Sequence, residues 1–249
     1  MTDEPLILPD RSCGSCTLCC KILSIEELQK PQNEWCTHCA VGTGCKVYDN
    51  RPRECSSFFC GYLTWPIAGK HWFPASSKIV IVSELEGQRI AIHVDPSRPG
   101  AWRDAPFYSE IKEWAVHAAP DMIQVVVCIR NRAIVILPDE DVDLGPIGPD
   151  ERIISGEVVE GGRTRLRAMK VKADDPMIAG MVGHLGHRAT RFDGPVPQPP
   201  IFLLLDDSGP ADRRSEGRCD RSARYCRQHQ IGRQILRRAP RARSRARRV

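Results

Sequence analysis

The alternation of apolar and polar positions is clearest in the middle of the chain. Residues 77–95 read SKIVIVSELEGQRIAIHVD, in which two β-branched runs flank a polar segment that contains Gly87. β-Branched residues favour strands, and a short polar break with glycine favours a turn. This stretch therefore predicts a β-hairpin.

Residues 107–118 follow a different period. The sequence FYSEIKEWAVHA places Ile111, Trp114 and Ala115 on one face at helical spacing, and Pro120 follows shortly afterwards. Such an apolar stripe is typical of an amphipathic helix, and proline does not continue one. We expect a helix here.

Further strands are predicted downstream of this helix. IQVVVCIR at 123–130 and RAIVILPD at 132–139 read as a second strand pair, and a Gly/Pro-rich loop follows them. Two more strands are predicted at 152–159 and 164–172. The middle of the chain is therefore expected to form an α+β layer.

The first part of the chain has few long apolar runs and many turn-forming residues. Within it, KILSIEELQK at 21–30 predicts a short helix with Ser24 as its N-cap and an end at Pro31. A segment of this composition does not form a core unaided. We expect it to need another source of stability.

The patterning fails after about residue 185. PVPQPP at 195–200 is typical of an extended linker, and residues 210–249 hold fourteen arginines against three acids. The tail is predicted to be disordered or to derive from a shifted reading frame in GC-rich DNA. Its arginines favour only non-specific contact with nucleic acid, because interleaved aromatic residues are lacking.

Composition sets limits on the cellular setting. The N-terminus MTDEPLILPD lacks a basic region followed by a long apolar stretch, and the aliphatic runs IVIV and IFLLL are too short to cross a bilayer. We therefore expect a cytoplasmic protein without a membrane partner. In a reducing cytosol, the twelve cysteines favour metal binding over disulfides.

Nine of these cysteines lie between residues 13 and 60, at spacings typical of metal ligands. The candidate ligands are Cys13, Cys16, Cys19, Cys20, Cys36, Cys39, Cys45, Cys55 and Cys60. If the CGSCTLCC segment were helical, Cys13, Cys16 and Cys20 would share a face, and Cys19 would point about 100° from Cys20. The vicinal pair would then be able to serve two metals.

The order C-x-x-C-x-x-C-C, followed by C-x-Y-x-x-R-P-x-x-C-x-x-x-x-C, resembles the zinc- or iron-chelating family named for its CxxCxxCC motif. The resemblance covers about residues 13–63. It implies ligation by the candidate thiols, with Cys36 as a further member and Cys39 as the least secure. A similar motif in proteins resembling flagellin lysine N-methylases implies an iron–sulfur or methyl-transfer possibility.

The predicted organisation follows. Residues 13–63 form a cysteine-rich metal-binding module, residues 64–185 form an α+β body continuous with it, and residues 195–249 form the linker and tail. The fold class is α+β, with the small module packed on a layer of antiparallel strands and one or two helices. The cofactor expected is zinc or iron, the latter alone or in an iron–sulfur cluster.

Three functions remain open on the sequence. The first is a metal-binding protein whose metal stabilises a segment with little core. The second is an iron–sulfur-dependent enzyme of redox or protein N-methylation type. The third is a zinc-stabilised interaction or nucleic-acid-binding module with Trp65, Trp72 and the Arg51/Arg53 turn as contacts.

Several other residues fit simpler interpretations. His38 is expected at the surface or beside the ligands, and Cys128 reads as a small buried residue on a strand. His184 and His187 lack a completing carboxylate motif. The acidic run PDEDVDLG, which lacks the terminal glutamate of a calcium loop, is predicted to be a solvated turn.

Overall fold

The computed structural model describes residues 7–175, so the predictions for the linker, the tail and the two histidines after residue 180 lie outside the described residues. The helices are α1 (Cys19–Ile22), α2 (Arg53–Ser57), α3 (Gly61–Thr64), α4 (Pro74–Ser77) and α5 (Phe107–Ala118). The strands are β1 (Cys39–Ala40), β2 (Gly44–Cys45), β3 (Ile79–Glu84), β4 (Arg89–Val94), β5 (Gln124–Ile129), β6 (Arg132–Ile136), β7 (Asp141–Pro146), β8 (Glu151–Glu160) and β9 (Arg163–Lys172).

A five-stranded sheet in the order β3-β4-β5-β6-β7 organises the body. Its pairs are antiparallel except β4 and β5, which run parallel from the register Arg89–Gln124 to His93–Cys128. The α+β class is confirmed, and the layer is mixed where a purely antiparallel one was expected. The crossover through α5 explains this, because parallel neighbours need a long connection between their ends.

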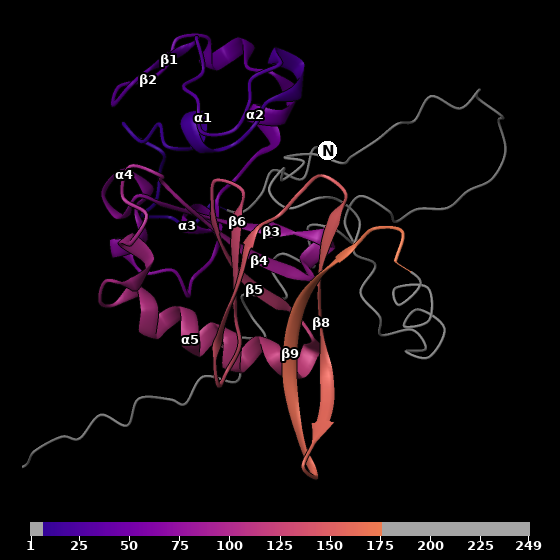
Figure 1. Ribbon diagram of the computed structural model, residues 1–249. Coiled ribbons are helices and arrows are strands. Elements are labelled where there is room, and N and C mark those ends of the chain that lie inside the picture. The colour runs from indigo at the N-terminus through magenta and orange to yellow at the C-terminus, as the bar shows by residue number, and fades with distance from the viewer. Residues whose placement is uncertain (1–6, 176–249) are drawn as a thin grey trace, which may run out of the picture.

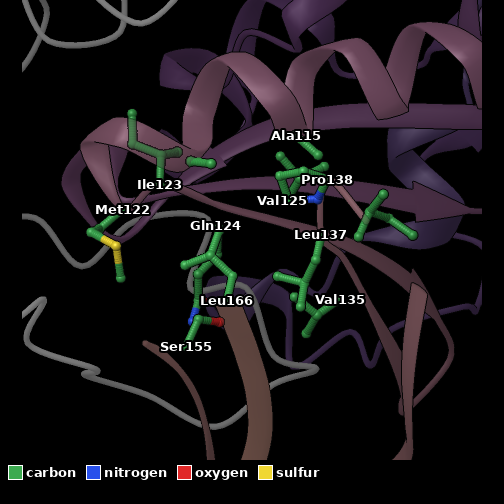
Figure 2. A pocket seen from close by; sticks show the side chains of 12 residues that line it. Ala115, Met122, Ile123, Gln124, Val125, Val135, Leu137, Pro138, Ser155 and Leu166 are labelled. Atoms are coloured by element: carbon green, nitrogen blue, oxygen red, sulfur yellow. The ribbon is translucent and has the colours of Figure 1, made fainter. Parts of the chain in front are cut away.

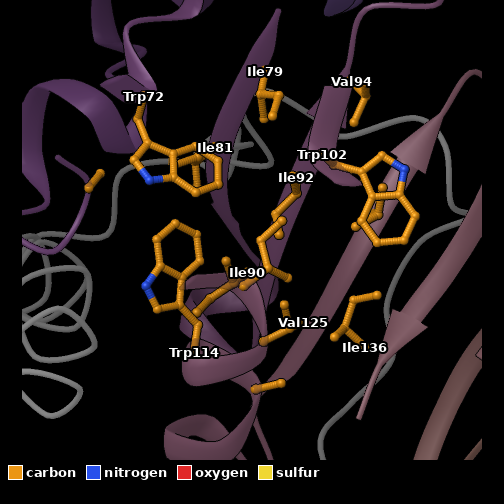
Figure 3. Packing of buried hydrophobic residues seen from close by; sticks show 14 of the residues in the cluster. Trp72, Ile79, Ile81, Ile90, Ile92, Val94, Trp102, Trp114, Val125 and Ile136 are labelled. Atoms are coloured by element: carbon orange, nitrogen blue, oxygen red, sulfur yellow. The ribbon is translucent and has the colours of Figure 1, made fainter. Parts of the chain in front are cut away.

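One face of the sheet carries the main hydrophobic core. Alternate residues of β3 and β4, such as Ile81 and Ile92, point into it and are about 1% exposed or less. The rings of Trp72 and Trp114 stack there with centroids 4.8 Å apart (Figure 3). The buried stripe of α5 closes this side, as its spacing predicted.

The other face is covered by two separate segments. The N-terminal module packs on Val80 and Val82 of β3, whereas the β8–β9 hairpin covers the β5 and β6 side through Ile153 and Leu166. The module lies at one end of the molecule and the hairpin projects from the opposite end (Figure 1). The module therefore rests on the sheet as well as being joined to it in sequence.

Buried polar groups also line β3, β4 and β5. Glu84 bonds His93 at 3.0 Å and lies 3.6 Å from Arg89, which in turn donates to Gln124. Burial by itself raises the pKa of Glu84, but the hydrogen bonds and charges of His93 and Arg89 outweigh it and hold that pKa below its usual value.

Most of the predicted elements are confirmed. The helix at 107–118 has the expected bounds, and β3 with β4 forms the predicted hairpin. The strand pair β5–β6 and the strands near 152–159 and 164–172 are also present.

Two predictions were wrong. The acidic run at 138–145 is not a solvated turn throughout, because β7 begins at Asp141 and its carboxylates pair with Lys112 and Arg132. The helix predicted at 21–30 is absent: α1 ends at Ile22, and a 3₁₀ turn at Glu26–Leu28 begins without a side-chain cap from Ser24. Within residues 7–175, no helix has the length and apolarity needed to cross a membrane.

Candidate metal centre

The first thiols are carried by a tight turn that leads into α1. The amide of Cys16 donates to the carbonyl of Cys13 at 2.8 Å, and Gly14 adopts a positive φ of 49° that favours glycine. The helix begins only at Cys19, so the helical face expected for Cys13, Cys16 and Cys20 does not form. The turn instead brings Cys13 back towards Cys16.

Lys30 explains why α1 ends so early. Its side chain is buried, and its ammonium group donates to the carbonyl oxygens of Lys21, Leu23 and Pro31. The bonds to Lys21 and Leu23 satisfy carbonyls that a continuing helix would have used. The lysine also places a positive charge close to the thiols of Cys20 and Cys36.

The second group of thiols lies on the β1–β2 knuckle. The amide of Cys36 donates to the carbonyl of Cys20 at 3.0 Å, which ties the knuckle to α1. Cys39 and Cys45 are register partners across the two strands. The intervening Gly42 has a φ of 73° and donates to the Thr17 hydroxyl at 3.1 Å. The turn at Gly42 thus holds the knuckle against the first segment.

The last two thiols lie on α2 and at the start of α3. The Glu54 carboxylate accepts from the amide of Glu26 at 2.8 Å, and Glu27 accepts from the amide of Glu54 at 3.2 Å. These two hydrogen bonds join α2 to the segment that follows α1. Because Cys55 is part of α2, they bring Cys55 towards the other thiols. Cys60 precedes α3 and is 9% exposed.

Electrostatics single out the vicinal pair. The Cys19 thiol hydrogen-bonds Cys20, and this bond, with those from Cys39 and the charge of Lys30, lowers the pKa of Cys20 to about 6 against the effect of burial. The same bond, together with burial and the neighbouring thiolates, raises the pKa of Cys19 well above its usual value. Of these two thiols, Cys20 ionises first.

Three of the surrounding thiols, those of Cys39, Cys55 and Cys60, are held in the protonated form at neutral pH. Burial raises the pKa of Cys55 and of Cys60 to about 12, and burial with the charge of Cys20 raises that of Cys39 to about 11. A bound metal ion supplies the opposite effect, because a coordinating thiol is deprotonated outright. Proton release is therefore linked to metal binding at these positions.

The donors fit a thiophilic metal, but their positions are not yet convergent. All ten cysteines among residues 7–175 are free thiols, and nine of them lie in this module. The backbone amides of Leu63 and Tyr62 donate to the Cys60 thiol, a contact typical of metal-bound sulfur. In the same range, no three Cys, His, Asp or Glu side chains are grouped so that they could hold an ion. Coordination would require the thiols to close on the metal.

Residues set aside as ligands are mostly placed as expected. Cys128 is buried on β5, where burial raises its pKa, and His38 is partly exposed beside the knuckle. The prediction that Trp65 and Trp72 are surface contacts of an interaction module was wrong. Both side chains are at most 3% exposed and belong to the core. They offer no surface for a partner.

Two depressions of the body, as far as residues 7–175 are described, have no thiol in their lining. One, between the end of α5 and the hairpin, has a volume of about 20 Å³ and an apolar lining that includes Ile123 and Leu166 (Figure 2). A water molecule needs about 10–15 Å³, so this space is too small for a substrate. The other, about 290 Å³, is a polar surface groove beside Arg165 and Glu140. Neither adjoins the candidate centre.

Sequence reasoning missed the groups that hold the thiols in place. Lys30, Arg51 and Glu54 are charged residues whose roles depend on contacts between distant segments. Arg51 packs over the Tyr48 ring at 3.7 Å. Desolvation and the charge of Cys16 raise the pKa of Cys13 above its usual value, and the charge of Arg51 opposes them in part. Comparison of the chain with protein-family models, curated proteins and solved structures finds no match.

Proposed function

We propose that the module at residues 13–60 is a thiolate chelator of zinc or iron, the iron alone or in an iron–sulfur cluster. The observation that carries this is the position of Cys20, whose low-pKa thiol accepts hydrogen bonds from Cys19 and Cys39 at the meeting point of α1 and the knuckle. A metal replaces those protons with coordinate bonds. The ion then joins segments that share few apolar contacts.

The stabilising role follows from the small core of the module. Its buried apolar residues are few, and Leu18, Ile22 and Leu23 depend on β3 of the body for part of their packing. Small segments of this kind often gain folding free energy from a structural metal. The bound ion would hold α1, the knuckle and α2 together.

Anaerobic purification, elemental analysis and a visible spectrum test the proposal. Zinc without visible absorbance identifies a zinc centre, and iron with inorganic sulfide and a brown colour identifies a cluster. Cys20→Ser should lower the metal content, whereas Cys128→Ala, which removes a thiol from the sheet, should leave it unchanged. A wild-type protein that retains neither metal after reconstitution would refute the proposal.

A further inference from the structure

Beyond the proposed function, we infer that the outer half of the β8–β9 hairpin is an arm that binds duplex DNA through its phosphates, without regard to base sequence. The arm comprises residues 156–167, and Arg163 and Arg165 are its contact residues. It lies at the end of the molecule opposite to the cysteine module (Figure 1). The inference is therefore independent of whether the module holds a metal.

The arm extends beyond the part of the hairpin that packs on the sheet. The two strands pair without interruption from Glu151–Lys172 to Glu160–Arg163, a length of about 30 Å. The inner half is tied to the body, because the Gln124 side chain donates to the Ser155 hydroxyl at 3.0 Å. The outer half projects away from the sheet (Figure 1), and Val159 near its tip is 75% exposed.

The register gives the hairpin two different faces. Successive side chains of a strand point to opposite faces, and directly opposed residues of an antiparallel pair share one. Ile153 and Leu166 pack with the hydrophobic cluster on β5 and β6, so their face is turned to the body. Arg163, Arg165 and Arg167 occupy the alternate positions of β9 and lie on the outward face.

The outward face of the arm is basic and open. The register partners of its three arginines on β8 are one glycine, one valine and one acid, namely Gly156 opposite Arg167, Val158 opposite Arg165 and Glu160 opposite Arg163. A Cβ atom at Gly156 would meet no described atom within 4 Å, so this part of the face is unobstructed. Glu157 is the register partner of Leu166 and therefore belongs to the body-facing side.

Two of the three arginines are available to a partner. Arg167 pairs with Glu140 at 2.5 Å, so its charge is balanced within the molecule. Arg163 and Arg165 are exposed, and among the described side chains no carboxylate pairs with either. A guanidinium group presents its N–H donors in a fork that matches two oxygens of a phosphate. These two side chains are therefore suited to the backbone of a nucleic acid.

The shape and composition of the hairpin favour duplex DNA over other nucleic acids. Its two strands lie about 4.8 Å apart, and the major groove of B-DNA, about 12 Å wide, admits a two-stranded ribbon. The major groove of duplex RNA is too narrow for one. Residues 151–172 contain no aromatic side chain, whereas proteins that bind single strands stack unpaired bases on such side chains.

The salt dependence of DNA binding by the full chain tests the arm. All variants keep the arginines of residues 210–249, so only differences between variants are compared. Arg163→Gln combined with Arg165→Gln should reduce the slope of log K against log salt by about 2 on duplex DNA. The control combines Lys46→Gln with Arg130→Gln, which remove the same charge from exposed positions outside the arm, and it should leave the slope unchanged. On duplex RNA of the same sequence, the arm variant should match the wild type.

Photo-crosslinking locates the contact directly. The photoreactive residue p-benzoylphenylalanine, introduced in place of Val159, should crosslink to duplex DNA. The same residue in place of Val116, which is 52% exposed on α5, should not. Circular dichroism checks that each variant is folded. Equal slopes for the arm variant and its control, or no crosslink from position 159, would overturn the inference. Competition by polyglutamate as effective as that by DNA would also overturn it, in favour of an acidic protein partner.

Discussion

Lys30 offers the sharpest test of how the module is held together. It is 8% exposed and donates three hydrogen bonds to backbone carbonyls, of which the bond to Leu23 is fully buried. Lys30→Met keeps most of the apolar stem and removes only the charged donor. The carbonyl of Leu23 then loses its partner in a place that water does not easily reach.

The magnitude follows from these contacts. A hydrogen bond from a charged donor contributes about 1.5–3 kcal/mol, and a buried carbonyl left unpaired costs about 1–3 kcal/mol. Burying the ammonium carries a cost of its own, since desolvation lowers the pKa of Lys30. The net loss in free energy of unfolding should therefore be about 2 kcal/mol, or a fall in melting temperature of about 4–8 °C for a chain of this size.

Urea unfolding of the zinc-loaded and metal-free proteins measures this loss. The loss should be larger with metal bound, because the charge of Lys30 acts on Cys19, Cys20 and Cys36 and offsets their thiolates. Lys46→Met is the matched control, since Lys46 is an exposed lysine of the same module. A loss below about 0.5 kcal/mol, equal to that of the control, would refute the reasoning.

Three other perturbations probe the body and its contact with the module. Trp114→Ala in the core should lower the free energy of unfolding by about 3–5 kcal/mol. Val116→Ala, on the exposed side of α5, should change it by less than about 0.5 kcal/mol. Equal losses for the two variants in urea titrations would contradict the packing of this helix. The fold holds the pKa of Glu84 below its usual value, so the stabilising contribution of this carboxylate is complete above about pH 4.3 and is lost as the pH falls through the lowered pKa. Glu84→Gln should therefore flatten the dependence of stability on pH between about pH 5 and about pH 3. An unchanged profile in acid titrations followed by circular dichroism would count against this ion cluster. Lys21 of the module pairs with Asp95 of the body at 2.6 Å. A double-mutant cycle of Lys21→Met and Asp95→Asn should therefore give a coupling free energy of about 0.5–3 kcal/mol. Additive losses in the free energy of unfolding would mean that this pair does not hold the module in place.

The sequence predicts the regular elements of the body well, because their periodicity reflects burial directly. The helix at 107–118 and the paired strands β5 and β6 follow from local pattern alone. β7 was missed although Val142 and Leu144 alternate with acids, because the acidic residues were interpreted as solvated. In the structure Asp141 pairs with Lys112 and Asp143 pairs with Arg132. The parallel pairing of β4 and β5 was also open to prediction, because a helix lies between them.

The candidate site was predictable in composition and not in arrangement. Spacing identifies the nine thiols as candidate ligands. However, α1 ends where the Lys30 ammonium donates to the carbonyls of Lys21 and Leu23, and no local sequence pattern predicts that contact. The exchange between Glu54, Glu26 and Glu27 is likewise a contact between distant segments. Which thiols face one another depends on these bonds, so the sequence alone left the grouping of ligands open.

Docking of the module on the sheet and the proposed binding of metal involve the same short segment. Between Cys16 and Leu23 the chain carries three thiols and three apolar residues. Leu18 and Ile22 form one hydrophobic cluster with Val80 of β3, and Cys16 and Cys19 pack against it. Displacing α1 from β3 would therefore break ligand contacts and expose apolar surface in one step, at about 25 cal/mol for each Å² exposed. Metal bound at this position should protect the amides of β3 and of α1 together, and hydrogen exchange that slows in α1 without slowing in β3 would show that the two are independent.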